Sequence, residues 1–194
     1  MRIPGVFGTS FEPEGEPRGT AVLVPGTGYP PQAPLLFFAG QALLQHGWRV
    51  EHHWWDPPEG ATTEEINAWV RAEVESALPD AGPALVVAKS LGTRAAPVAA
   101  ERGLPAVWLT PLLGSRFLVD AIAANPAPQL LVGGAADHLW DTEVAHNLES
   151  ATCSVLEVPD ADHAMLVAGD SVRGVAVHVE VQRAVDAWLG SIVG

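Results

Sequence analysis

Short apolar runs alternate with longer amphipathic segments along most of the chain. Six of these runs have the length and the apolar content that are typical of strands. The predicted strands are Thr20–Pro25, Trp48–Trp55, Ala84–Lys89, Ala106–Pro111, Gln129–Gly134 and Cys153–Val158. Several are apolar throughout, which indicates parallel strands that are covered on both faces of a sheet.

Helical periodicity fills the intervals between the strands. The predicted helices are Leu35–His46, Glu64–Leu78, Leu91–Arg102 and Val172–Ile192. Thr62 and Glu65 have the spacing of a capping box before the second helix, and Gly47 and Gly103 stand where C-caps of the first and third are expected. In the last helix we expect a sheet-facing stripe of Val175, Val179, Val185, Trp188, Leu189 and Ile192.

The alternation of strands and helices predicts a single α/β domain over residues 1–194. We expect three layers: a doubly wound, mostly parallel sheet of about six or seven strands, with helices on both faces. For the segment Pro4–Gly19 a short antiparallel strand and a plain loop both stay open. The stretch LLGSRFLVDAIAANPAP between the fourth and fifth strands suffices for one helix and a turn, so we expect no lid domain.

Composition narrows the class of protein. Hydrophobic residues make up 48% of the chain and charged residues 17%, which favours a folded protein with a large core. The net charge of −13 argues against binding to nucleic acid and to anionic membranes. No apolar run approaches the roughly 18 residues of a membrane-spanning helix, and the first residues are too rich in Pro and Gly for a signal peptide. We therefore expect a cytoplasmic protein.

The single cysteine, Cys153, excludes an internal disulfide and a cysteine-based zinc site. It falls in a predicted strand, where we expect it to act as a small buried hydrophobe.

The residues that follow the strands are the candidates for chemistry, because ligands of doubly wound sheets bind at the carboxyl ends of the strands. Ser90 follows the third strand in the sequence AKSLG. A serine on a tight strand-to-helix turn needs small residues two positions before and after it, and Ala88 and Gly92 meet this need. Taken alone the motif is weak, because a serine at this position can also cap the following helix.

Two later strands are followed by an acid and a histidine. Asp137 comes after the fifth strand, in GGAADHLWD, and His163 comes after the sixth, in VPDADHAML. Asp141 is a rival acid, but it precedes TEVAHNLES as an N-cap would. The other histidines are weaker candidates: His46, His146 and His178 lie in helical segments, and His138 adjoins the acid, where it could not readily face Ser90.

In the type, order and placement of Ser90, Asp137 and His163 the chain resembles the α/β-hydrolase fold superfamily, specifically its small serine esterases without a lid. The resemblance runs from TAVLVPGTGYP to the last helix. It implies that Ser90 attacks an acyl carbon, that His163 takes and returns the proton, and that Asp137 holds the imidazole in the right tautomer. It also implies an oxyanion hole made by the backbone amides of Thr27 and Leu91, and no cofactor.

Two positions depart from the commoner pattern of that family. Ala88 stands where glycine is usual, and Pro25 stands where histidine is usual. Ala88 is still small, and the oxyanion donors are backbone amides, so neither change removes a required group. Gly26 and Gly28 allow the loop after the first strand to approach the reacting atoms closely. As a phosphate loop it is poor, since it lacks the third glycine of the dinucleotide fingerprint and the Lys-Ser/Thr of a nucleotide loop.

The expected function is hydrolysis of a small carboxylic ester through an acyl-enzyme intermediate, with a small-molecule acyl substrate as the expected partner. A thioesterase, amidase or peptidase on the same triad stays open, and so does a binding or regulatory protein that has kept the fold without turnover. Trp54, Trp55 and Trp140 fall at the active edge, where they either line an acyl or aryl pocket or serve packing alone.

Two further features have alternative explanations. His52 and His53 suggest a metal site, but no cluster at ligand spacing supports one, and we expect the two rings to face opposite sides of the sheet. Lys89 directly precedes Ser90. It either forms a structural pair with a carboxylate, which we favour, or attracts an anionic group of the substrate. The candidate carboxylates are Asp162, Asp160 and Glu157.

Overall fold

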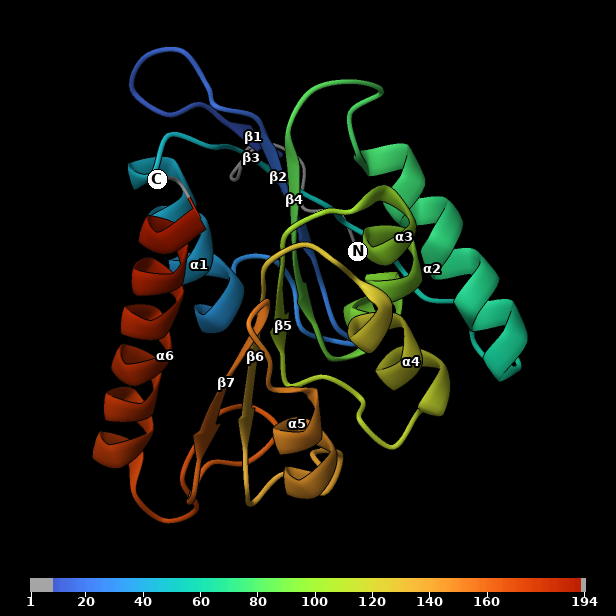
Figure 1. Cartoon of the computed structure of the whole chain (residues 1–194). Helices are drawn as coiled ribbons and strands as arrows, with labels where there is room; N and C mark the ends of the chain where they lie inside the picture. Colours follow the sequence, from blue (N-terminus) through green and yellow to red (C-terminus); the bar gives the residue numbers. More distant parts are fainter. Residues whose placement is uncertain (1–8, 193–194) are drawn as a thin grey trace.

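The structure, a computed structural model, describes residues 9–192 and contains one seven-stranded sheet (Figure 1). Its strand order is β1-β3-β2-β4-β5-β6-β7. The strands are β1 (Ser10–Phe11), β2 (Thr20–Val24), β3 (Arg49–His52), β4 (Ala84–Lys89), β5 (Ala106–Leu109), β6 (Gln129–Gly134) and β7 (Cys153–Val158). All neighbouring pairs are parallel except β1 with β3. The predicted three-layer, mostly parallel α/β fold is therefore confirmed.

The sheet edge at β1 and β3 refines two expectations. The short antiparallel strand is present, with Ser10 opposite Glu51, while the part of the Pro4–Gly19 segment before residue 9 lies outside the described residues. The predicted strand Trp48–Trp55 is too long, because regular pairing ends at His52. The next residue, His53, still donates a backbone hydrogen bond to Leu23, and the chain then leaves the sheet.

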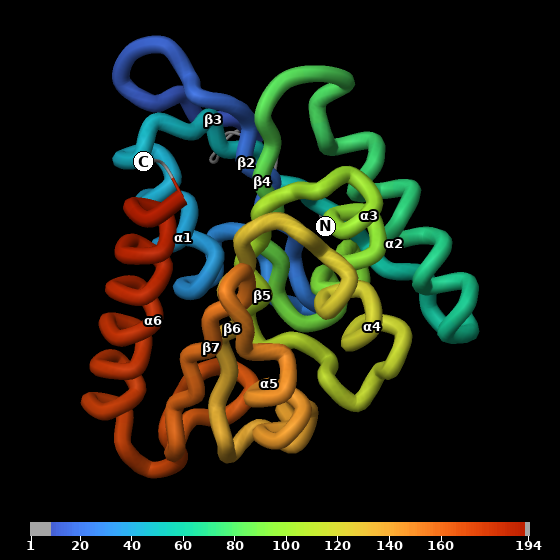
Figure 2. Tube along the Cα trace, in the orientation of Figure 1, coloured from blue at the N-terminus to red at the C-terminus, as the bar shows by residue number. Residues whose placement is uncertain are grey.

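Helices cover both faces of the sheet. On one face lie α1 (Pro34–Gln45) and α6 (Ser171–Ile192); on the other lie α2 (Thr63–Ala77), α3 (Ala96–Arg102), α4 (Arg116–Ala124) and α5 (Thr142–Leu148) (Figures 1 and 2). Each face has its own cluster of buried side chains, and residues of β2, β4, β5 and β6 alternate between the two clusters. Cys153 is buried in the second cluster, as expected. Over residues 9–192 none of the helices has the length and apolarity needed to cross a bilayer.

The predicted start of α2 is confirmed, whereas the predicted start of the third helix is corrected. Thr62 and Glu65 form the predicted capping box at the start of α2. The predicted helix Leu91–Arg102 instead begins with a 3₁₀ segment, η1 (Ser90–Ala95), and becomes α-helical only at α3. Pro97 explains the change, because proline has no N–H to extend an α-helix backwards and favours the first helical turn.

The prediction for α6 is wrong at two positions. Val175 and Val179 are 66% and 45% exposed, whereas the buried face consists of Gly174, Val177, Val181, Val185, Trp188 and Leu189. Valines recur at every second residue from 175 to 181, so they occupy both sides of a helix with 3.6 residues per turn. The contacts with α1 and the sheet decide which of them are buried.

Candidate active site

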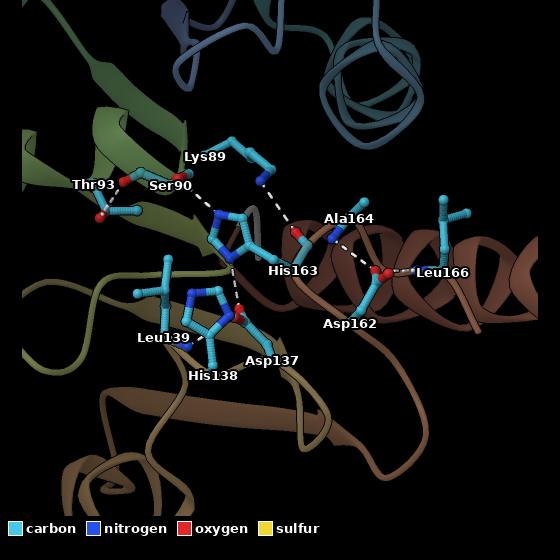
Figure 3. Close-up of polar contacts among 10 residues, drawn as sticks. All are labelled: Lys89, Ser90, Thr93, Asp137, His138, Leu139, Asp162, His163, Ala164 and Leu166. Carbon is cyan, nitrogen blue, oxygen red and sulfur yellow. Dashed lines mark hydrogen bonds and ion pairs between the residues drawn. The ribbon is translucent and has the colours of Figure 1, made fainter. Parts of the chain in front are cut away.

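Three loops at the carboxyl ends of β4, β6 and β7 bring a serine, an acid and a histidine together (Figure 3). Ser90 comes directly after β4, Asp137 lies in the loop after β6, and His163 lies in the loop after β7. His163 Nε2 is 2.8 Å from Ser90 Oγ, and its Nδ1 is 2.7 Å from Asp137 Oδ2. The three residues singled out in the sequence thus form one continuous hydrogen-bonded chain.

Solvent exposure increases along this hydrogen-bonded chain, from the acid to the histidine. The Asp137 side chain is fully buried, and its second oxygen accepts a hydrogen bond from the backbone N–H of Leu139 at 2.9 Å. The His163 side chain is 28% exposed. A buried carboxylate at Nδ1 favours the tautomer that carries its proton there, which leaves Nε2 free to accept the proton of the Ser90 hydroxyl. Asp141, the rival acid, caps α5 by accepting a hydrogen bond from Val144 N–H.

The turn at Ser90 has strained backbone geometry. Ser90 has φ 52°, in the left-handed region that non-glycine residues seldom adopt, at a cost of about 1–3 kcal/mol. Thr93 stabilises the turn, since its hydroxyl donates to the Ser90 carbonyl at 2.6 Å. A Cβ on Gly92 would lie 2.6 Å from the carbonyl oxygens of Val24 and Pro25. The glycine is therefore required by the close approach of this turn to the end of β2.

The loop that carries His163 is held by Asp162. Asp162 Oδ1 accepts hydrogen bonds from the backbone N–H groups of Ala164 and Leu166, at 2.8 and 2.9 Å. Its own backbone N–H donates to the Leu166 carbonyl, which closes the turn. Met165, at the apex, is buried and has φ 58°. This network fixes the backbone immediately on both sides of the histidine.

A pocket of about 430 Å³ opens beside Ser90. It is lined by Thr27, Gly28, Tyr29, Lys89, Ser90, Ala136, His138, Asp162, His163 and Ala164. The loop after β2 enters this lining through a tight turn in which Gly26 and Tyr29 exchange backbone hydrogen bonds. A Cβ on Gly26 would lie 3.2 Å from Ser90 Cβ, so the loop passes directly beside the serine.

The three tryptophans considered for substrate binding are placed elsewhere. Trp140 is buried against Gly133, where a Cβ would lie 2.0 Å from the ring, and its Nε1 donates to Glu157. Trp55 packs on Trp69 with ring centroids 4.9 Å apart. Trp54 is half-buried and, like the other two, is not among the residues that line the pocket beside Ser90. The packing interpretation holds for Trp55 and Trp140.

His52 and His53 face opposite sides of the sheet, as expected. The His52 ring lies 4.7 Å from that of Phe11, whereas His53 Nε2 lies 2.8 Å from Glu73 of α2. Burial lowers the pKa of His52 to about 4. In the part of the chain that the structure describes, no three His, Cys, Asp or Glu side chains gather as a metal site would require.

Lys89 does not form the carboxylate pair that the sequence favoured. Its Nζ donates to the backbone carbonyl of His163 at 3.1 Å (Figure 3). The three candidate carboxylates have other partners: Asp162 binds backbone amides, Asp160 binds Arg173, and Glu157 binds Trp140. The difference arises because the ammonium reaches the turn of the histidine loop, where a carbonyl is the nearest acceptor.

Sequence reasoning missed two residues of the pocket. Tyr29 lies under the Lys89 ammonium, 4.8 Å from ring centroid to Nζ, and its hydroxyl accepts a hydrogen bond from Leu35 N–H. Tyr29 is the single tyrosine of the chain, which could have marked it. His138 was set aside as unable to face Ser90, yet its exposed ring lines the same pocket. Its neighbour Asp137 is fully buried, although His138 Nδ1 lies only 3.9 Å from Asp137 Oδ1.

Comparison with known proteins identifies the fold. No protein-family model and no curated protein matches this chain. Among solved structures, the esterase domain of a Rhodothermus marinus protein is 18% identical, with a TM-score of 0.65, over 95% of this chain and 92% of its own. Est1E from Butyrivibrio proteoclasticus, with ferulic acid bound, is 14% identical, with a TM-score of 0.69, over 94% of this chain and 93% of its own.

A third similar structure is an α/β serine hydrolase without a lid from Xanthomonas campestris. It is 18% identical, with a TM-score of 0.59, over 92% of this chain and 87% of its own. At these identities the likeness speaks for the fold and not for a reaction. Between β5 and β6 this chain has α4 alone, in agreement with a fold that carries no lid there. The chain has the α/β-hydrolase fold, in its small form without a lid.

Proposed function

We propose that this protein is a serine hydrolase that cleaves small carboxylic esters. The observation that carries the proposal is the unbroken hydrogen-bonded chain from Ser90 through His163 to Asp137. Ser90 also sits on a strained turn next to a pocket of a size that suits a small acyl group. The likeness to esterases and serine hydrolases of the same fold supports the same class of reaction.

The reaction would proceed in two halves. Ser90 Oγ attacks the carbonyl carbon of the ester while its proton passes to His163 Nε2, and the bond from carbon to the alkoxy oxygen then breaks as that oxygen takes the proton from His163. Water next attacks the acyl-enzyme and gives a proton to His163. The bond from carbon to Ser90 Oγ breaks, Oγ recovers the proton, and the carboxylic acid leaves. Asp137 stays ionised throughout and stabilises the imidazolium.

Two backbone amides are the proposed donors to the oxyanion. Leu91 is the second residue of η1, so its N–H belongs to the first turn of a 3₁₀ segment, where amides have no partner within the helix. Thr27 belongs to the loop that lines the pocket beside Ser90. Loss of one such donor costs about 10²- to 10³-fold in rate in comparable enzymes.

A fluorophosphonate probe and a chromogenic ester test the proposal. We expect the wild-type protein to be labelled by the probe and to hydrolyse p-nitrophenyl acetate, and Ser90→Ala to do neither. Ser76→Ala is the control, because it removes an exposed serine hydroxyl of α2 that does not line the pocket. Equal labelling of wild type and Ser90→Ala would reject the assignment. A parallel series of thioester and amide donors would establish which acyl compounds are accepted.

A further inference from the structure

Lys89 is the only lysine among the ten lysine and arginine residues of the chain. It is also buried, with 3% of its surface exposed, whereas four of the arginines, Arg49, Arg71, Arg116 and Arg173, engage carboxylates at the surface. Burial of a lysine costs free energy, because its ammonium loses hydration. The one lysine thus occupies the position next to Ser90, where packing alone would favour an apolar residue.

The side chain of Lys89 crosses from the serine turn to the histidine loop. Its stem runs beside Gly26, where a Cβ would lie 3.3 Å from Lys89 Cδ. Its ammonium lies over the ring of Tyr29 and donates to the carbonyl of His163 at 3.1 Å. Lys89 is therefore a direct link between the residue before the nucleophile and the backbone of the histidine (Figure 3).

The groups around the ammonium come from each loop that packs against it. Tyr29 lies on the loop after β2, Asp137 on the loop after β6, and Asp162 with His163 on the loop after β7; His138 lines the same pocket. Burial lowers the pKa of Lys89 to about 8, against the opposing effect of the charges of Asp137 and Asp162. The ammonium in turn offsets part of the negative charge that Asp137 and Asp162 bring to this region.

We propose that Lys89 is a positioning residue that holds the His163 loop against the serine turn, so that Nε2 stays within hydrogen-bond reach of Ser90 Oγ. This inference rests on the proposed hydrolase function. An ammonium hydrogen bond to a carbonyl is stronger than that of a neutral amine, so the clamp weakens when Lys89 loses its proton. Arginine would place a wider, planar group in the same space, which explains why a chain otherwise furnished with arginine has lysine here.

Lys89→Met keeps the length of the stem and removes the donor. We expect kcat for p-nitrophenyl acetate to fall about 10- to 100-fold with KM little changed, as for a small misplacement of a reacting group. We also expect kcat/KM of the wild type to decline as the pH rises through about 8, and this alkaline decline to be absent from Lys89→Met. A purely structural lysine would affect the fraction of folded protein and leave the pH profile in place.

Arg94→Met is the matched control. Arg94 is a cation of η1, the segment that follows Lys89, but it binds Asn67 of α2 and lies outside the Ser90 pocket, so we expect a wild-type pH profile. Any of three results for Lys89→Met would overturn the positioning role. They are a wild-type kcat, an alkaline decline that persists in the variant, and a loss of activity that only follows unfolding.

Two further measurements keep the outcomes distinct. If Lys89→Met does not fold, the Asp162→Asn variant serves instead: loss of the Asp162 charge should move the alkaline decline to lower pH, and an unmoved decline would overturn the proposal. Ser90→Ala separates the two proposals. If Ser90→Ala abolishes turnover while Lys89→Met keeps it with its alkaline decline, only the role of Lys89 fails. Turnover that survives Ser90→Ala overturns both.

Discussion

The turn that carries Ser90 and the loop that carries His163 are held in place by different forces. The serine turn is fixed by close packing, since Gly92 lies against the backbone of β2 and leaves no space for a Cβ. The histidine loop is fixed by hydrogen bonds of two charged side chains: Asp162 accepts within the loop, and Lys89 donates from outside it. Both contain a non-glycine residue in the left-handed region, Ser90 and Met165.

This difference predicts different responses to perturbation. Packing between backbone atoms does not titrate, so defects in the serine turn should be equal at all pH values at which the protein is folded. The hydrogen bond of the Lys89 ammonium does titrate, so loss of this contact to the histidine loop should have an effect that depends on pH. The variants below test this contrast, starting with the largest expected effect.

Asp137→Asn should cause the largest loss. The amide keeps the size of the side chain but favours the wrong tautomer of His163, and the loss in kcat should be about 10⁴-fold, as for the corresponding change in serine proteases. Initial rates with p-nitrophenyl acetate and the rate of probe labelling measure it.

Asp141→Asn is the control for this change, since it lies in the same segment and caps α5. It should cost at most about 1 kcal/mol of stability and leave kcat in place. An Asp137→Asn protein as active as Asp141→Asn would contradict the role of Asp137.

Gly92→Ala should break the serine turn by overpacking. The new methyl group would meet two carbonyl oxygens at 2.6 Å, so the turn or the end of β2 must shift. We expect a loss of about 1–3 kcal/mol in the free energy of unfolding and a fall in kcat of about 10²-fold. Urea unfolding measures the loss in stability, and initial rates measure the fall in kcat. Relative to wild type, each loss should be the same at pH 6 as at pH 9.

Gly114→Ala is the matched control, because a Cβ there meets nothing within 4 Å. Its stability should stay within about 0.5 kcal/mol of the wild type. A Gly92→Ala protein that behaves like Gly114→Ala would mean that the turn yields without cost.

The same contrast explains which parts of the molecule the sequence predicts. The strands and the serine turn depend on neighbours close in sequence: apolar runs, and small residues at positions 88 and 92. The meeting of Ser90, Asp137 and His163 is predicted from their places after the third, fifth and sixth predicted strands of one parallel sheet. What holds the histidine is different, because the Lys89 contact spans 74 residues and depends on how two loops meet. No periodicity encodes such a contact, and the expected partners were therefore carboxylates.

Two other side-chain placements have a similar cause. The sequence pattern predicts Val175 and Val179 on the sheet side because valines repeat on both sides of α6, and only the contacts with α1 and the sheet decide between them. Trp140 lies in the loop after β6, where the sequence leaves a pocket role and packing both open, and its ring packs onto Gly133. In both instances side-chain direction is set by tertiary packing, which the one-dimensional pattern does not contain.

Asp162→Asn should weaken the histidine loop without unfolding the protein. An amide oxygen still accepts the hydrogen bonds of Ala164 and Leu166, but without the charge that strengthens them. We expect about 1 kcal/mol of local stability to be lost and kcat to fall by about tenfold or less. Hydrogen exchange of the Ala164 and Leu166 amides should accelerate. Asp160→Asn, in the same loop but bound to Arg173, should leave these two amides protected.

The last expected effect is on stability and not on the rate, and it tests whether the Lys89 ammonium is desolvated in the folded protein. Burial lowers its pKa from 10.5 to about 8. Between these pH values the unfolded chain holds a proton that the folded chain has lost, so the unfolded state binds more protons and the free energy of unfolding rises with pH. Lys89→Met lacks this contribution. The stability of the wild type relative to Lys89→Met should therefore be constant below about pH 8 and increase from there towards pH 10.5.

Urea unfolding of both proteins at a series of pH values measures this difference. The titrations of His52 and Cys153, whose pKa values are about 4 and about 11, occur in both proteins and cancel. Gly92→Ala compared with wild type should give a constant offset over the same range, as packing defects do. A Lys89→Met difference that is equally constant would show that the ammonium keeps its hydration in the folded state. Among the charged side chains that hold the histidine loop, Asp162 alone would then distinguish it from the serine turn.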